Sequence, residues 1–534
     1  MPTNHPEYDA LYAAVCATPD DDTPRLVLAD WLDEHDDPHR AAHIRGAVNF
    51  ARMQENDPHT AAVVAMRRRA GHTDWFHYAD VAAISPEVAR MDGFQKQAVK
   101  WQTKAEVRWK HVMGKRSVGT APGLQRGFPH TITVRDCKSY AAKQPPENLP
   151  GYSYFVVEPR INGAFDDFLA CPNFARATGV YLYSATSPEV IRGFGHCPAV
   201  RNFRSLKLSF NSANPAYVVA VAMQPNWSGL THLEFWRSDY GRDSLLDLPP
   251  EFTRATQFAT LQALELGLRG ITGASVVSLA QMPWPHLRTL DLHYNRVSAL
   301  GAAALANGKF PELRSLDLSS NRIGNIGAAA FADSGKLPAL ATLDLSSNDI
   351  TDPKAMAQLI AGPAFPVLTG LSLRDNRCNL LHARSLADLG RGPTLRLLSL
   401  RHCSLNEDAA VSLAAAPSLA HLVALDLAGN AIGDVGARAI AMSKWDRMTC
   451  LDLGTNGITG NGVEALVMWP GLAKLQFLNL GGNPIGLAGV KALVACPTLK
   501  KCRKLVVSTD KTDLGKGGLQ LLEARFGRRL DCRS

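Results

Sequence analysis

The chain has 534 residues, of which 46% are hydrophobic and 20% charged, and it carries a formal net charge of +8. A single hydrophobic core rarely grows beyond roughly 250 to 300 residues, so one compact domain is excluded, and the ordinary apolar fraction excludes wholesale disorder. The ten cysteines include no CxxC pair, and the longest uninterrupted apolar stretch, 216–223, is too short to span a bilayer. The first residues lack the basic and apolar regions of a secretory signal, so we expect a cytoplasmic protein.

The N-terminal 53 residues are an acidic segment that we expect to fold as three short helices. Residues 1–45 carry three arginines against ten acidic residues, a balance of −7. Prolines punctuate the segment, and Thr23 followed by Pro24 is typical of an N-cap with proline in the first turn. This acidic head is therefore predicted to be a unit distinct from the basic remainder.

Three histidines of the head are spaced four residues apart, at His35, His39 and His43. Such spacing can present a metal-binding face on a helix. Pro38 breaks the helical register between the first two, so we expect solvent-facing histidines and no bound metal.

A basic amphipathic helix is predicted between the head and the rest of the chain. From Phe94 to Val112 apolar residues recur every three or four positions. Four cationic residues lie beside its tryptophans, at Lys96, Lys100, Lys104 and Arg108. We expect residues 54–123 to form a helical linker that caps the following array. The alternative is that the basic helix binds an acidic surface, nucleic acid or a membrane.

One repeated motif organises the remaining chain. The pattern L-x-x-L-x-L-x-x-N begins at Leu287, Leu313, Leu340, Leu368, Leu422 and Leu475, with looser copies from Phe203, Leu230, Leu261, Leu395, Met448 and Cys502. Nine of the eleven intervals between these starts are 26 or 27 residues. The alternating L-x-L predicts a short strand, and the Gly- and Ala-rich stretch after the Asn predicts a helix. Because no copy can bury its own core, the copies must stack, with the sheet on the inner side of the curve.

The repeat phase extends to both sides of the clear copies. Weaker strands are predicted at 132–134, 155–157 and 180–182, and residues 514–526 are predicted to form a closing helix. The recurring Asn is expected to pair backbone groups at the tight turn, and Cys403 replaces it in one copy. Most cysteines are expected to be small buried hydrophobic residues.

Two resemblances follow from these residues. Residues 287–483 resemble leucine-rich repeats of the ribonuclease-inhibitor type, including the shape L-D-L-S-S-N-x-I-G-x-x-G-A at 316–328. Residues 11–38 resemble the repeat-companion domain found at the N-terminus of bacterial proteins that carry such repeats. The resemblances imply an α/β protein in which a small all-α domain at 1–53 and a linker at 54–123 precede a leucine-rich repeat solenoid at 124–534, a horseshoe with a parallel inner sheet and outer helices.

The concave sheet is the predicted binding surface. The residue between the last two leucines of each copy is expected to point out of the sheet, and carboxylates occupy this position at Glu234, Glu265, Asp291, Asp317, Asp344, Asp426 and Asp452. Side chains suited to anchor an interface lie beside this stripe, at Trp236, His293, Tyr294, Arg374, Arg401 and His402. We expect this surface to bind a protein or peptide with a basic surface. The alternative interpretation is that L-D-L-S is only the consensus sequence of these repeats, without a role in binding.

No enzyme motif is present, since the sequence lacks GxxxxGK followed by Ser or Thr, HExxH and GxSxG. We therefore expect a non-enzymatic interaction scaffold without a cofactor, whose partner is a protein and not a membrane. One alternative is a regulator of a small GTPase, by analogy with activators built from ribonuclease-inhibitor-type repeats. The other is nucleic-acid binding through the helix at 94–115 and the basic C-terminus, with a steep loss of affinity in salt. The layout of charge favours the protein partner.

Overall fold

A computed structural model describes residues 5–17, 21–56, 124–125, 128–129, 131–134, 154–157, 178–182, 187–210, 214–237, 246–361, 364–377, 395–508 and 511–533. The basic helix predicted between Phe94 and Val112 lies outside the described residues, as does most of the predicted linker at 54–123. The described elements belong to two compact units, the first containing the head and strands up to Gly270, the second containing Ile271–Pro283 and everything from Arg288 onwards.

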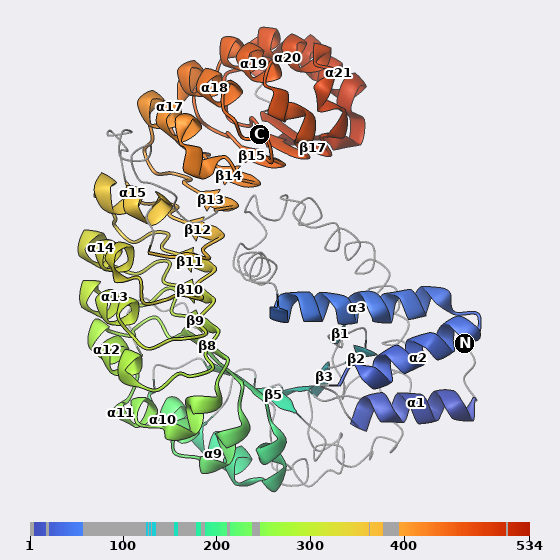
Figure 1. The fold of residues 1–534 in the computed structure, drawn as a ribbon, viewed down its shortest axis with the longest axis vertical. Coiled ribbons are helices and arrows are strands. Elements are labelled where there is room, and N and C mark those ends of the chain that lie inside the picture. Colours follow the sequence, from blue (N-terminus) through green and yellow to red (C-terminus); the bar gives the residue numbers. More distant parts are fainter. Residues whose placement is uncertain are drawn as a thin grey trace. The chain divides into compact units, whose positions relative to one another are not determined.

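Helices and strands alternate along most of the chain (Figure 1). The α-helices are α1 (Pro6–Ala17), α2 (Thr23–Glu34), α3 (Pro38–Asn56), α9 (Pro188–His196), α10 (Ala216–Ala222), α11 (Pro250–Thr253), α12 (Gly273–Gln281), α13 (Ala299–Ala306), α14 (Gly324–Ser334), α15 (Pro353–Ala361), α17 (Glu407–Ala415), α18 (Gly433–Ala441), α19 (Gly460–Val467), α20 (Gly486–Ala495) and α21 (Lys511–Phe526). The strands are β1 (Leu124–Gln125), β2 (Phe128–Pro129), β3 (Thr131–Val134), β4 (Tyr154–Val157), β5 (Gly179–Leu182), β6 (Ser205–Phe210), β7 (His232–Arg237), β8 (Ala263–Gly267), β9 (Thr289–Asp291), β10 (Ser315–Asp317), β11 (Thr342–Asp344), β12 (Gly370–Ser372), β13 (Leu397–Ser399), β14 (Ala424–Asp426), β15 (Cys450–Asp452), β16 (Phe477–Asn479), β17 (Lys504–Ser508) and β18 (Leu530–Arg533).

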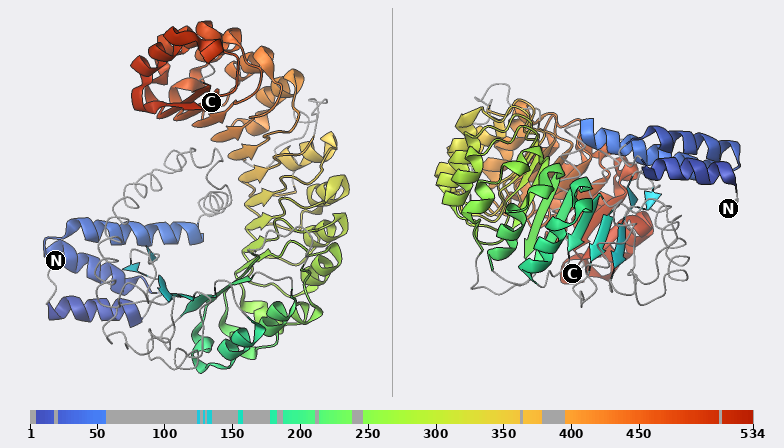
Figure 2. Two further views of the ribbon diagram at one scale, coloured as in Figure 1. Left: turned by 180° about the vertical axis from the view of Figure 1, so that it is seen from behind. Right: turned by 90° about the horizontal axis from the view of Figure 1, so that it is seen from below.

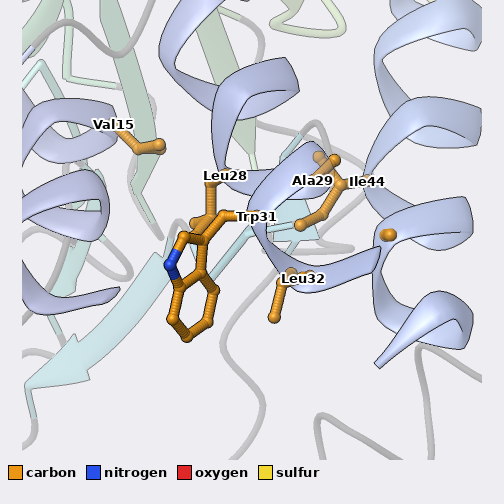
Figure 3. Packing of buried hydrophobic residues seen from close by; sticks show 7 residues of the cluster. Val15, Leu28, Ala29, Trp31, Leu32 and Ile44 are labelled. Atoms are coloured by element: carbon orange, nitrogen blue, oxygen red, sulfur yellow. The ribbon is translucent and has the colours of Figure 1, made fainter. Parts of the chain in front are cut away.

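The head consists of the three predicted helices, α1, α2 and α3. Helix α2 supplies the centre of a small core, in which Leu28 and Trp31 are buried against Val15 of α1 and Ile44 of α3 (Figure 3). Fully burying a side chain of this size contributes about 1.5 to 3 kcal/mol, so the hairpins α1–α2 and α2–α3 are held mainly by this apolar contact.

The start of α2 differs from the prediction by one residue. The helix begins at Thr23 itself, and Asp22 occupies the N-cap position without a capping hydrogen bond from its side chain. The carboxylate of Asp21 instead accepts the Thr23 backbone N–H at 2.8 Å, which lowers the pKa of Asp21. Arg52 of α3 donates to Asp22 at 2.9 Å, so the acidic run ties the third helix to the start of the second.

The repeats form parallel strands that pair in chain order within each unit. In the first unit β3 to β8 pair successively, so the weak strands predicted at 132–134, 155–157 and 180–182 are confirmed. In the second unit β9 to β18 pair successively. Equivalent residues stand opposite one another, as Asp317 does between Asp291 and Asp344. Each L-x-L leucine of the clear copies is almost wholly buried beneath the helices.

The second unit has two faces (Figure 2). Its helices lie on one side of the sheet, and we call the opposite side the strand face. The predicted closing helix at 514–526 is confirmed by α21. The structure adds β18, which the sequence analysis did not predict: this strand pairs with β17, and Asp531 forms an ion pair with Lys504 at 2.8 Å.

The recurring Asn pairs backbone groups at the turn, as predicted. Asn321, 4% exposed, donates to the carbonyl of Leu318 in its own copy at 2.9 Å and to that of Leu292 in the preceding copy at 3.0 Å. Its side-chain oxygen accepts the Val297 backbone N–H at 2.9 Å. Equivalent bonds recur along the second unit, so each of these asparagines links its copy to the one before it.

One copy carries a thiol in this ladder. Cys403, wholly buried, donates its S–H to the Leu373 carbonyl at 3.1 Å, in the place of the amide N–H that an asparagine would supply. The residue before each ladder position has a positive φ, as at Tyr294 (53°), Asp375 (54°) and His402 (51°). The backbone N–H of Tyr294 reaches the Ser319 carbonyl of the next copy at 2.9 Å, so this left-handed turn extends the pairing between copies.

Candidate partner-binding surface

The predicted site residues of the second unit form two rows on the strand face. We call the first the carboxylate row: Asp291, Asp317, Asp344, Asp426 and Asp452, each the last residue of its strand. We call the second the turn row: His293, Tyr294, Arg374, Arg401 and His402, which follow strands β9, β12 and β13. Because neighbouring strands lie about 4.8 Å apart, Arg374 and Arg401 are one strand spacing apart along the face.

The carboxylate row is built into the turns. In every copy Oδ1 of the Asp accepts the backbone N–H two residues further on, at distances of 3.0, 2.8, 2.9, 3.0 and 2.9 Å in chain order. Asp317, Asp426 and Asp452 are 1%, 0% and 2% exposed, and Asp291 is also buried. Asp344 is the partly exposed member of the row. These carboxylates therefore stabilise the turn, and four of the five offer almost no surface to a partner.

Burial also changes the charge of this row. At Asp426 burial raises the pKa well above its ordinary value, and the neighbouring carboxylate of Asp452 raises it further. The Ala428 N–H, Arg401 and the Ser399 hydroxyl act in the opposite direction, without cancelling the rise in the pKa. Burial thus disfavours the charged form of Asp426, the most deeply buried carboxylate of the row.

The turn row presents accessible side chains instead. Tyr294 is 60% exposed, and its ring meets the ring of His293 edge-on, with centroids 5.5 Å apart and planes at 72°. The buried Asp291 orients the His293 ring, because Nδ1 of His293 lies 2.6 Å from Oδ1 of Asp291. An aromatic pair on a fixed turn is thus displayed at the start of the second unit.

The cationic members of the turn row lie three and four copies further on. Arg374 is partly exposed and its Nε donates to Asp375 at 2.9 Å. Nε of Arg401 is buried and makes no hydrogen bond within the described part of the chain. The exposed His402 lies over Gly429, where a Cβ would come 2.1 Å from the imidazole ring. Glycine at this turn, with φ +69°, is what lets the ring lie against the backbone.

Glu234, Trp236 and Glu265 belong to the first unit, so the structure describes them as a separate group. Glu234 of β7 stands opposite Glu265 of β8 and forms an ion pair with Lys207 of β6. Trp236 packs over Gly267, at which a Cβ would lie 3.0 Å from the indole. All three predicted residues are partly exposed.

Two further properties bear on the class of site. Ligand atoms of Asp291, His293 and Asp317 lie within 4.8 Å of one another. Oδ1 of each carboxylate already accepts a turn N–H, which identifies these side chains as part of the turn. Among the described residues no helix is long and apolar enough to cross a membrane.

Comparison with known proteins agrees with this architecture. Two family models described as leucine rich repeat match, one at residues 285–350 and the other at 418–441, 448–467 and 471–494. The chain therefore carries leucine-rich repeats, and its fold is a leucine-rich repeat solenoid. Proteins of this kind usually bind other proteins and are generally not catalytic.

Two solved structures are similar to this chain at low identity. An internalin of Listeria monocytogenes is 17% identical, over 65% of this chain and 93% of that chain, with a TM-score of 0.41. TLR13 in a complex with ssRNA13 is 19% identical, over 72% of this chain and 57% of that chain, with a TM-score of 0.38. No curated protein matches the sequence. The likeness concerns the fold alone.

Proposed function

We propose that this protein is a non-enzymatic scaffold that binds a protein or peptide across the strand face of its second unit. The observation that carries the proposal is Tyr294, a large aromatic side chain that is 60% exposed on an otherwise polar turn. Exposed aromatic residues with arginines nearby are the side chains that contribute most at protein interfaces.

The framework beneath Tyr294 supports this role. The backbone N–H of Tyr294 is bonded to Ser319, that of His293 to Asp291, and the following Asn295 is buried in the ladder. A side chain presented on a fixed backbone loses little conformational freedom when a partner binds, which favours affinity.

The charge of the partner is the finer part of the proposal. The sequence predicted a basic partner because carboxylates occupy consecutive copies from Glu234 to Asp344. In the second unit, burial leaves Asp344 as the partly exposed member of the carboxylate row. The partly exposed cationic side chains further along the face are Arg374 and Arg401. We therefore place an apolar or aromatic contact at Tyr294 and a carboxylate-bearing segment of the partner opposite the arginines, and keep the basic partner as the competing form.

Affinity capture with the full chain, followed by mass spectrometry and by direct binding of the captured protein, tests the proposal. Tyr294→Ala should weaken binding by about 30-fold or more, as expected for the loss of a central anchor worth at least about 2 kcal/mol. Met442→Ala is the matched control, since this residue is 80% exposed at the end of α18 on the helix side. Equal affinity of both variants and the unaltered chain would exclude the strand face as the binding surface.

Charge reversal separates the two forms of partner. Arg374→Glu should weaken the binding of an acidic partner and not that of a basic one, whereas Asp344→Lys should weaken the binding of a basic partner and not that of an acidic one. Reversing the buried Asp317 is uninformative, because it would break the turn. The GTPase-regulator alternative rests on analogy, and the nucleic-acid alternative rests mainly on residues 94–115, outside the described part of the chain.

The resemblance of residues 11–38 supports a further part of the proposal, namely that residues 1–53 are a repeat-companion domain in a bacterial cytoplasmic protein. Residues 54–123 would then be the linker or cap, and 124–534 the solenoid.

A further inference from the structure

The head brings His35 beside two residues, His5 and Glu7, that lie far from it in the sequence. His5 precedes α1, Glu7 lies in the first turn of α1, and His35 is the C-cap residue of α2. One potential ligand atom of each lies within 4.8 Å of the other two. The packing of α1 on α2 places the start of the first helix beside the end of the second, which creates this cluster (Figure 1).

His35 is held in the orientation and tautomer of a metal ligand. Its Nδ1 lies 2.8 Å from the backbone oxygen of Trp31, and because a carbonyl only accepts, Nδ1 carries the proton and Nε2 keeps its lone pair. The ring also stacks on the Trp31 indole, with centroids 3.8 Å apart and an interplanar angle of 14°. A backbone acceptor on the second ring nitrogen is the usual support of a histidine that binds a metal.

Glu7 is oriented by the same tryptophan. Its Oε2 accepts the Trp31 Nε1–H at 3.1 Å and lies 3.9 Å from Nδ1 of His5. The Trp31 side chain therefore contacts all three candidate ligands: it donates a hydrogen bond to Glu7, stacks on His35 and meets the ring of His5 at a centroid distance of 5.2 Å.

His5 supplies a second, independent observation. Its Nδ1 is buried from solvent and has no hydrogen-bond partner within the described residues. The ring stands edge-on to that of His35, with centroids 5.3 Å apart. Removing a polar atom from water without giving it a partner is unfavourable, and a bound cation would remove that cost.

We propose that His5, Glu7 and His35 bind a divalent transition metal ion, and that the ion is Zn²⁺ or one of similar ligand preference. Two imidazoles and one carboxylate form a set that zinc accepts, whereas Ca²⁺ and Mg²⁺ require mostly oxygen ligands. Three protein ligands leave a position for water. The site also lies in a segment whose charge balance over residues 1–45 is −7, which favours a bound cation.

The geometry requires a small closure on binding. Zinc bonds of 2.0 to 2.1 Å place tetrahedral ligand atoms about 3.3 Å apart, so the cluster must contract from its present spacing. The side chains of His5 and Glu7 are 41% and 69% exposed, which leaves them room to rotate towards the fixed His35. The metal would then connect the start of α1 to the end of α2 and stabilise the hairpin.

This site departs from the sequence analysis, which expected no metal and considered His35 only with His39 and His43. The four-residue spacing of the three histidines suggested that they share one helix face, but only His39 and His43 lie on α3. The partner of His35 is instead supplied by the residues at the start of α1, a contact that depends on tertiary packing.

Titration of the metal-free full chain with Zn²⁺ by calorimetry, and with Co²⁺ by visible absorption, tests the proposal. We expect one site that is weakened at least about 10-fold in His5→Ala, Glu7→Gln and His35→Ala. His421→Ala, an exposed histidine outside the cluster, is the matched control and should bind as the unaltered chain does. Ca²⁺ should not compete.

His5 lies before α1 and outside the apolar core of the head. His5→Ala should therefore leave the head folded and keeps the test informative even if Glu7→Gln or His35→Ala unfolds it. The absence of Zn²⁺ binding to the unaltered chain at millimolar metal would overturn the proposal. So would equal affinity of His5→Ala and His421→Ala, provided that both show the same circular dichroism as the unaltered chain.

Discussion

The asparagine ladder makes a quantitative prediction about stability. Asn321→Ala removes the amide that donates to Leu292 and Leu318 and the oxygen that accepts from Val297. These three bonds are buried, so water cannot replace them. At about 1 to 1.5 kcal/mol for each bond, the variant should lose about 3 to 5 kcal/mol of unfolding free energy.

A second asparagine of the same repeat copy, Asn325 in α14, gives a matched control. Asn325 also makes three hydrogen bonds, one to the Thr351 hydroxyl and two from the backbone N–H groups of Thr351 and Asp352, but all three are exposed. Water replaces exposed bonds at little cost, so Asn325→Ala should lose less than about 1 kcal/mol. Asn321→Cys should lie between the two, since Cys403 shows that a thiol can keep one of the donor bonds.

Urea unfolding followed by circular dichroism measures these differences. The midpoint should fall in the order unaltered chain, Asn325→Ala, Asn321→Cys, Asn321→Ala, with an unchanged slope. A loss at Asn321→Ala within about 1 kcal/mol of that at Asn325→Ala would refute the reasoning, because it would mean that burial does not decide the value of these bonds.

Three other predictions follow from burial. Asp426 has a raised pKa in the folded state, so its ionisation destabilises the fold as the pH rises from the ordinary pKa of an aspartate through the pKa in the folded protein. Asp426→Asn cannot ionise, so its stability relative to the unaltered chain should increase as the pH of urea titrations is raised above 4. A difference that does not change with pH would contradict this. Leu316→Ala should cost about 2 to 5 kcal/mol and Leu300→Ala, at a residue 65% exposed, less than about 1, in thermal or urea unfolding. Burial raises the pKa of the Cys450 thiol, so iodoacetamide at pH 8 should leave it unlabelled in the native protein, whereas the partly exposed Cys197 should react; labelling of Cys450 without urea would count against the buried thiol.

The repeat phase accounts for how well the strands could be predicted. Leucines at a fixed spacing mark buried positions directly, and even the strand at Thr131–Val134 falls on the phase despite its lack of leucine. The final strand, Leu530–Arg533, could not be found this way, because it follows a closing helix and carries no copy of the motif. Its position depends on pairing with Lys504–Ser508, a contact between segments and not a local pattern.

The candidate surface was predicted less completely, since alternation identifies the face of a residue and not its exposure. Asp317 and Tyr294 both project from the strand face, yet one is 1% and the other 60% exposed. The difference comes from the turn: the Asp bends back to the N–H two residues on, whereas the tyrosine stands at the left-handed position beyond it. The recurrence of Asp two residues before each turn was the available signal for the first of these roles.

The thiol at Cys403 has a consequence for how the array loses its structure. In a stack of coupled repeats, cooperativity is set by the interfaces between neighbours, and the weakest interface is where the stack separates. Sulfur is a weaker donor and acceptor than an amide, so the copy of β13 is joined to that of β12 by a weaker bond than its neighbours have. We expect partial openings of the native second unit to divide it between Gly370–Ser372 and Leu397–Ser399, which hydrogen exchange would show as a step in protection at this interface.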